Sequence, residues 1–265
     1  MLKIQDMPLE LGSFPDGTML THIPLPERGA VTVHWRYEND TETLALYYAV
    51  NHLKAHGFTD IHLVMPYLPN ARQDRVKTDE DVFTLKYFAQ LINSLGFTTV
   101  TVRDPHSSVG EALIDRLVVE KPTAYIQKVI AYIEAETGKT PAMFYPDEGA
   151  GKRYGGMIPL PYAFGIKRRD WKSGKILGLD VAGDVDTISG SDVLIVDDIC
   201  SKGGTFYFSA KRLKELGAGR IWLFVTHCEN TILQGDLLQG DLIEEVFTTE
   251  SIFTKEHSRV RLVTL

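Results

Sequence analysis

Apolar and polar positions along the chain follow two periods, one typical of amphipathic helices and one of buried strands. Residues 43–56 carry apolar Leu46, Val50 and Leu53 at helical spacing, and Gly57 follows them, which predicts a helix that ends there. The same reasoning predicts strands at 61–65, 98–102 and 193–196, and a helix at 82–95 that ends at Gly96.

Helices and strands are predicted to alternate throughout, which favours an α/β fold with mainly parallel sheets and helices on both faces. The second half repeats the plan of the first. Residues 92–106 and 214–227 each contain a helix end, a Leu-Gly step, a strand and then a histidine. We therefore expect two similar α/β domains, at about 1–118 and 119–265.

Composition narrows the range of partners and compartments. The 265 residues include 28 basic and 35 acidic side chains, a net charge of −7, which argues against a general nucleic-acid binder. No apolar run reaches the length of a membrane span, and the N-terminus does not resemble a signal peptide. Only Cys200 and Cys228 are present, so we expect structural thiols in a reducing, cytoplasmic compartment.

The segment VLIVDDICSKGGT at 193–205 carries the strongest chemical signal. A buried strand ends in Asp197 and Asp198, a loop with two glycines follows, and Thr205 opens an amphipathic helix. Ligands of open α/β sheets bind beyond the carboxyl ends of strands, and a glycine loop before a helix can wrap an anion with backbone N–H groups. The pattern indicates a sugar-phosphate site, and the alternative is a tight turn with solvated acids.

A second segment, PNARQD at 69–74, follows the strand predicted at 61–65. Together the two segments resemble the ribose-phosphate pyrophosphokinase family, whose members make phosphoribosyl pyrophosphate (PRPP). The family's PYARQD corresponds to PNARQD here, and its VDDxxDTGGT corresponds to VDDICSKGGT. The resemblance implies two phosphoribosyltransferase-like domains. It also implies ATP contacts from Arg72, Gln73 and Asp74, and acceptor contacts from Asp197, Asp198, Ser201, Lys202, Gly203, Gly204 and Thr205.

Three further segments match the family. His106 in DPHS corresponds to a histidine at the ATP triphosphate and its metal, and Asp147 in FYPDEGAGKR corresponds to a Mg²⁺-binding aspartate in SPDAGGAKR. Lys167 and Arg169 match a basic loop, as in KERK, that acts on the transferring phosphates. Taken alone, these residues have ordinary interpretations: a structural histidine, a helix cap and a solvated basic run.

Near the N-terminus, FPDGT at 14–18 resembles the family's FxDGE. The resemblance implies that Phe14 stacks on adenine and Asp16 accepts a hydrogen bond, in the ATP site of a neighbouring subunit. A β-turn is the alternative interpretation, and Thr18 replaces the family's acid.

The implied enzyme is a diphosphotransferase that moves the β,γ-diphosphate of Mg²⁺-ATP to the anomeric hydroxyl of ribose 5-phosphate, with ATP and that acceptor as partners and a homo-oligomeric assembly. Ser201 replaces an acid and Lys202 replaces a threonine where the acceptor phosphate should lie, which favours a substituted acceptor such as ADP-ribose as an alternative. Two further interpretations are a PRPP-consuming phosphoribosyltransferase and an inactive regulatory homologue.

Overall fold

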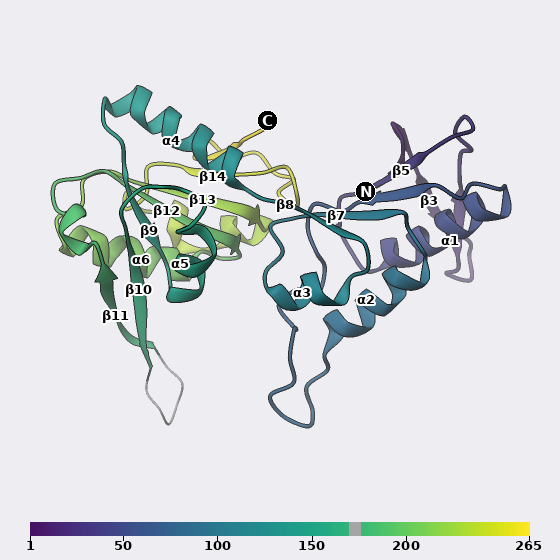
Figure 1. Ribbon diagram of the computed structural model, residues 1–265, viewed down its shortest axis with the longest axis horizontal. Helices are drawn as coiled ribbons and strands as arrows, with labels where there is room; N and C mark the ends of the chain where they lie inside the picture. The colour runs from purple at the N-terminus through teal and green to yellow at the C-terminus, as the bar shows by residue number, and fades with distance from the viewer. Residues whose placement is uncertain (170–175) are drawn as a thin grey trace. The chain divides into compact units, whose positions relative to one another are not determined.

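The computed structural model describes residues 1–169 and 176–265, with the side chains of 167–169 and 176–177 outside the description. The chain separates into two compact units, Met1–Lys121 (unit 1) and Pro122–Leu265 (unit 2), each with its own sheet and core (Figure 1).

Unit 1 is built on a sheet with strand order β2-β1-β5-β6-β7-β8. Strands β5 to β8 pair in parallel, and β1 is antiparallel to both β5 and β2. The strands are β1 Leu2–Ile4, β2 Met7–Pro8, β5 Val31–Trp35, β6 Ile61–Val64, β7 Thr99–Arg103 and β8 Leu117–Glu120. A separate hairpin consists of β3 Glu10–Ser13 and β4 Met19–His22, and the helices are α1 Thr41–Ala55, α2 Thr84–Ser94 and α3 Ser108–Leu113.

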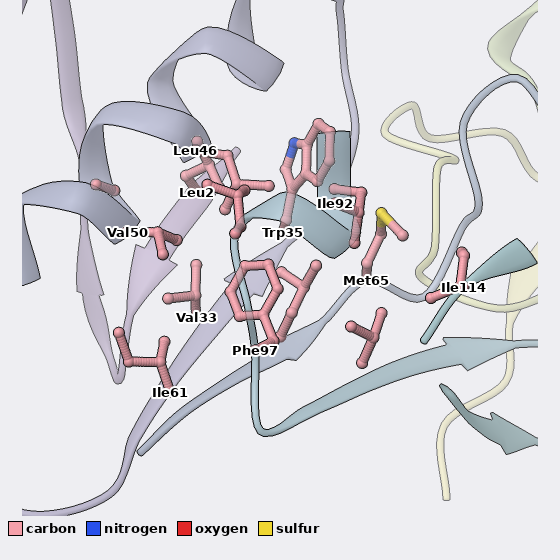
Figure 2. Packing of buried hydrophobic residues seen from close by; sticks show 14 of the residues in the cluster. Leu2, Val33, Trp35, Leu46, Val50, Ile61, Met65, Ile92, Phe97 and Ile114 are labelled. Carbon is pink, nitrogen blue, oxygen red and sulfur yellow. The ribbon is translucent and has the colours of Figure 1, made fainter. Parts of the chain in front are cut away.

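The core of unit 1 lies on one face of this sheet. Val31, Val33 and Trp35 of β5 are fully buried, whereas Thr32 and His34 between them are half-buried or exposed. Helices α1 and α2 pack into the same cluster, where Figure 2 shows side chains of both helices and of the sheet converging around Trp35 and Phe97. The prediction of helices on both faces is therefore wrong for unit 1, because α1 and α2 share one face of its sheet.

Unit 2 has a sheet of order β11-β10-β9-β12-β13-β14-β15, parallel except for the β10–β11 pair. Its strands are β9 Ala142–Tyr145, β10 Tyr162–Arg169, β11 Ile176–Gly183, β12 Val193–Cys200, β13 Ile221–Cys228, β14 Val246–Thr248 and β15 Val260–Leu262. Its helices are α4 Thr123–Thr137, α5 Glu148–Tyr154 and α6 Gly204–Glu215, with 3-10 turns η1 Val185–Thr187, η2 Asn230–Gln234 and η3 Asp236–Leu238.

Both faces of the unit 2 sheet are covered. Val193, Ile195 and Val225 pack with α6, whereas Leu194 and Val196 pack with α4 and α5 on the other face. Alternate residues of β12 and β13 thus enter two different cores, which is why the first parts of these strands, 193–196 and 221–225, are continuous apolar runs. Here the prediction of helices on both faces is confirmed.

Candidate functional site

The carboxyl ends of β9 and β12 bring three acids of unit 2 together. The two strands are parallel, with Ile195 opposite Phe144, so Asp197 and Asp198 lie near Asp147 at one edge of the sheet. The carboxylate of Asp147 caps α5 by accepting a hydrogen bond from the backbone N–H of Ala150 at 3.1 Å. Strand β12 also runs through both of its acids to Cys200, four residues beyond the predicted strand.

Asp198 is held by a guanidinium from α5. Arg153 Nη1 lies 2.8 Å from Asp198 Oδ2, and Asp198 Oδ1 accepts from the backbone N–H of Ile199 at 2.8 Å. Asp198 is buried, with 5% of its surface exposed. A buried carboxylate is tolerated only when it is paired and hydrogen-bonded, and Arg153 satisfies that requirement.

The other acid of the pair, Asp197, has a raised pKa. Burial raises the pKa of Asp197 well above its ordinary value, and the negative charges of Asp198 and Asp147 raise it further. Its carboxylate accepts from the backbone N–H of Asp198 at 3.0 Å. A cation or a hydroxyl donor arriving at this edge would therefore stabilise the charged form of Asp197.

The glycine loop after β12 packs against η3 and against the residue that precedes η3. Gly203 has a φ of +82°, and a Cβ at this position would lie 2.7 Å from Leu237 Cδ2. A Cβ on Gly235 would overlap the carbonyl oxygen of Lys202. Helix α6 begins at Gly204, so backbone N–H groups at its N-terminus follow the loop directly. The Lys202 side chain is exposed.

In unit 1, Asp74 links two loops that follow parallel strands. Asp74 is buried and accepts two hydrogen bonds from Arg75, at 2.7 and 3.1 Å. These bonds hold the pKa of Asp74 below its ordinary value, with smaller contributions from a hydrogen bond to Ser107 and from His106. The loop containing PNARQD therefore lies against the DPHS loop, whereas Arg72 is exposed.

The neighbouring residues show how these loops are held. Gln73 is exposed, and its Oε1 accepts from Thr84 Oγ1 at 2.8 Å. Asp104, at the end of β7, is buried with a φ of +42°, a left-handed conformation that is uncommon for a residue other than glycine. His106 follows it and is half-buried. Loops in such conformations are kept in place by the surrounding structure and cluster at functional sites.

FPDGT forms the tip of the β3–β4 hairpin, so the turn expected as the alternative interpretation is present. Asp16 Oδ1 accepts from the N–H and hydroxyl of Thr18, at 2.9 and 2.7 Å, which lowers the pKa of Asp16. The Phe14 side chain is exposed.

The basic run predicted at 166–175 lies partly in a strand. The backbone of Lys167 and Arg169 belongs to β10, with Lys167 opposite Leu179 and Arg169 opposite Ile176 of β11. Their side chains, and residues 170–175, lie outside the described part of the chain.

Among the described residues, no group of three His, Cys, Asp or Glu side chains forms a ready-made metal centre. A hard cation such as Mg²⁺ usually keeps several waters and takes one or two carboxylates together with substrate phosphates. Asp147 and Asp197 could supply such a pair of carboxylates, since they lie close together at the carboxyl ends of β9 and β12 and burial, with the charges of Asp198 and Asp147, raises the pKa of Asp197.

The burial of the two cysteines is consistent with a structural role. Cys200 and Cys228 are buried, free, and opposite each other on β12 and β13. A hydrogen bond with Cys228 and burial raise the pKa of the Cys200 thiol well above its ordinary value, which disfavours the reactive thiolate.

Comparison with known proteins agrees with this geometry. The family model for the N-terminal domain of ribose phosphate pyrophosphokinase matches residues 2–96. The solved phosphoribosylpyrophosphate synthetase of Mycobacterium smegmatis has the same fold, with a TM-score of 0.79 at 19% identity, over 97% of this chain and 85% of that one. A ribose-phosphate pyrophosphokinase of Pyrococcus abyssi is 30% identical over 83% of this chain and 75% of its own length.

The chain belongs to the ribose-phosphate pyrophosphokinase family. A second relative in the family, from Saccharolobus solfataricus, is 26% identical over 85% of this chain and 79% of its own length. The predicted family and fold class are thereby confirmed, and the chain is an enzyme of this transferase class. In the described part of the chain, every helix is too short or too polar to cross a bilayer.

The structure also reveals contacts that the sequence did not indicate. Arg153 is the last residue of the FYPDEGAGKR segment, and no role was predicted for it. Nothing in the sequence connected it with Asp198, 45 positions away. Gly235 lies outside every predicted motif, yet it contacts the glycine loop.

Proposed function

We propose that this enzyme transfers the β,γ-diphosphate of Mg²⁺-ATP to the anomeric hydroxyl of ribose 5-phosphate, giving PRPP and AMP. The observation that carries the proposal is the arrangement at the end of β12, where an acid pair precedes a glycine loop and a helix N-terminus. Acids that accept from ribose hydroxyls beside a loop that binds phosphate suit a ribose 5-phosphate unit.

The acceptor is assigned to unit 2. Asp197 and Asp198 accept from the ribose hydroxyls, and the backbone and side chains of residues 201–205 hold the 5-phosphate. The buried Gly203, fixed by Leu237, supports this role because the loop needs no large rearrangement before it binds.

ATP is assigned to unit 1, through Arg72, Gln73 and His106, with Asp74 holding the two loops together. Phe14 and Asp16 of the hairpin are proposed to contact the adenine in a neighbouring subunit of a homo-oligomer. The exposed Phe14 ring is available for stacking.

Asp147 of unit 2 and His106 of unit 1 are each proposed as Mg²⁺-binding residues. The cation would neutralise phosphate charge and orient the diphosphate for in-line attack. Lys167 and Arg169 are proposed to stabilise the charge that develops on the transferring group. The protein's own contribution is thus to position two substrates and to supply fixed charge.

The test is product analysis with Mg²⁺-ATP and ribose 5-phosphate. We expect AMP in a one-to-one ratio with PRPP. Stoichiometric ADP would indicate an ordinary kinase, activity only when PRPP is supplied would indicate a phosphoribosyltransferase, and no turnover with any acceptor would indicate a regulatory homologue. Each of these three results contradicts the proposal.

Lys202, which replaces the family's threonine, is the basis for ADP-ribose as a second candidate acceptor, while its exposed side chain also fits the alternative in which it points to solvent and ribose 5-phosphate is the acceptor. A flexible ammonium beside the 5-phosphate site is suited to an additional phosphate group. Comparing kcat/KM for ribose 5-phosphate and ADP-ribose, in the wild type and in Lys202→Thr, separates the two. A preference for ADP-ribose that falls in Lys202→Thr supports the larger acceptor, and a preference for ribose 5-phosphate that the substitution leaves unchanged excludes it.

A further inference from the structure

Arg153 holds one of the two acids at the proposed acceptor site. It stands in the last turn of α5, and its Nη1 lies 2.8 Å from Asp198 Oδ2. Of the two side chains, Asp198 is 7% exposed and Arg153 is 26% exposed. This is a charged hydrogen bond with its acidic end shielded from water, a setting in which such bonds are strong and directional.

The pair fixes which way the Asp198 carboxylate faces. Oδ1 accepts from the backbone N–H of Ile199 at 2.8 Å, and Oδ2 accepts from Arg153. Because both oxygens accept hydrogen bonds, rotation of the carboxylate about the Cβ–Cγ bond breaks at least one of them. The remaining lone pairs of Asp198 therefore have a defined direction.

Arg153 is itself held in place. Its guanidinium carbon lies 5.7 Å from the centre of the Tyr154 ring, which is fully buried. Helix α5 begins at the cap made by Asp147 and packs against β9, β10 and β12. One short helix thus connects the proposed cation ligand at its start with the Asp198 partner near its end.

A counter-charge is needed here because the acids crowd one another. Asp197 and Asp198 are adjacent, and Asp147 is close enough to act on Asp197. Arg153 brings a positive charge into direct contact with this group through its ion pair with Asp198. Without Arg153, repulsion would favour turning the Asp198 carboxylate away from that of Asp197.

We propose that Arg153 is a positioning residue that orients Asp198 for the acceptor's ribose hydroxyls. The inference rests on the proposed function, because it assigns Arg153 to binding of that acceptor. Arg153 acts through Asp198 and does not itself touch the substrate. The effect of losing it should therefore be selective for the acceptor and dependent on Asp198.

The experiment compares Arg153→Gln and Arg153→Lys with the wild type, and uses Lys152→Gln as a matched control. Lys152 is the preceding residue on the same helix and makes an exposed pair with Glu148 at 2.9 Å. Arg153→Gln should raise the KM for the acceptor about tenfold or more, while the KM for ATP changes by less than about twofold. Arg153→Lys should restore part of the loss, and Lys152→Gln should behave like the wild type.

A double-mutant cycle shows whether Arg153 acts through Asp198. In an Asp198→Asn background, Arg153→Gln should change the acceptor KM by less than about threefold, because the carboxylate that Arg153 orients is already absent. Should Arg153→Gln alone fail to fold, the double variant removes the unpaired buried charge, and its acceptor KM should equal that of Asp198→Asn.

The inference is overturned if both KM values change together, if only the melting temperature falls, or if the two substitutions act independently. These results would leave AMP and PRPP formation by the wild type intact, so the proposed function would survive them. Absence of AMP formation by the wild type would instead remove the proposed function, and this inference with it.

Discussion

The two units place polar side chains at the ends of parallel strands in contrasting ways. In unit 1, the buried Asp74 is paired with its own neighbour Arg75, whose side chain is 66% exposed. In unit 2, the buried Asp198 is paired with Arg153 from another element, 45 positions away in sequence. The ion pair of Asp74 is thus made within one loop, whereas the ion pair of Asp198 joins two packed elements.

The difference concerns how firmly each unit holds its proposed site residues before a ligand binds. The acids and glycine loop of unit 2 are fixed by β12, α5 and η3 before any ligand arrives. The residues proposed to contact ATP, Arg72 and Gln73, are exposed side chains of a loop, in which Gln73 accepts a hydrogen bond from Thr84. We therefore expect substitutions in unit 2 to affect acceptor binding through packing, and substitutions in unit 1 to affect ATP binding through loop order.

The largest effect should come from unit 2. Lys167→Ala removes the charge proposed to stabilise the transferring group, and should lower kcat about 100-fold or more without changing the unfolding transition. Steady-state kinetics and thermal denaturation measure the two. Lys211→Ala, on the exposed surface of α6, is the control. Activity of Lys167→Ala within about threefold of the wild type would indicate that the basic run is only a solvated surface with no role in catalysis.

The packing of the glycine loop provides the next test. Gly235→Ala would force the Lys202 carbonyl away, and Gly203→Ala would strain a φ of +82° against Leu237. Each should lower the free energy of unfolding by about 1–3 kcal/mol and raise the acceptor KM more than the ATP KM.

Gly156→Ala is the matched control for these substitutions, because nothing lies within 4 Å of a Cβ there and its φ is not positive. Chemical denaturation gives the stability and initial rates give both KM values. Equal KM values in the wild type and Gly235→Ala would show that the loop is not pre-formed in the way described.

A smaller effect is expected in unit 1. Asp74→Asn breaks the bonds from Arg75 and weakens the link to Ser107, so the ATP KM should rise several-fold while the acceptor KM stays the same. The loss of stability should be below about 2 kcal/mol, because Arg75 is largely exposed and solvent screens the pair. Asp115→Asn, an exposed acid in the same unit, is the control.

The Asp74 contribution should also depend on pH. Its pKa is lower in the folded than in the unfolded chain, so its contribution is complete above the unfolded pKa and is lost as pH falls through the folded pKa. The stability difference between wild type and Asp74→Asn should therefore disappear on acidification. A difference that grows as pH falls would contradict the assignment.

The smallest effect should come from the cysteines. Cys200 and Cys228 are buried, and the pKa of Cys200 is raised, so a thiol reagent at neutral pH should leave the folded enzyme unmodified and active to within about twofold. Both thiols should react once the chain is unfolded. Rapid labelling of the folded enzyme would show that this edge of unit 2 opens.

Local sequence patterns predicted the helices and strands well, but they did not predict which residues from distant parts of the sequence contact each other. Helical spacing placed the helix at 43–56, observed as Thr41–Ala55, because apolar periodicity is a property of the segment itself. The one-faced sheet of unit 1 escaped prediction, since alternation of helices and strands does not say on which side each helix packs. Likewise, the Arg153–Asp198 pair and the Gly235 contact depend on the register of distant elements.

The most direct test of diphosphate transfer follows the phosphorus atoms of ATP. With ATP labelled at its β-phosphorus, Mg²⁺ and the preferred acceptor, we predict that the label moves quantitatively into the sugar product and that the AMP formed is unlabelled. Label retained in ADP, with only the γ-phosphate transferred, would contradict it.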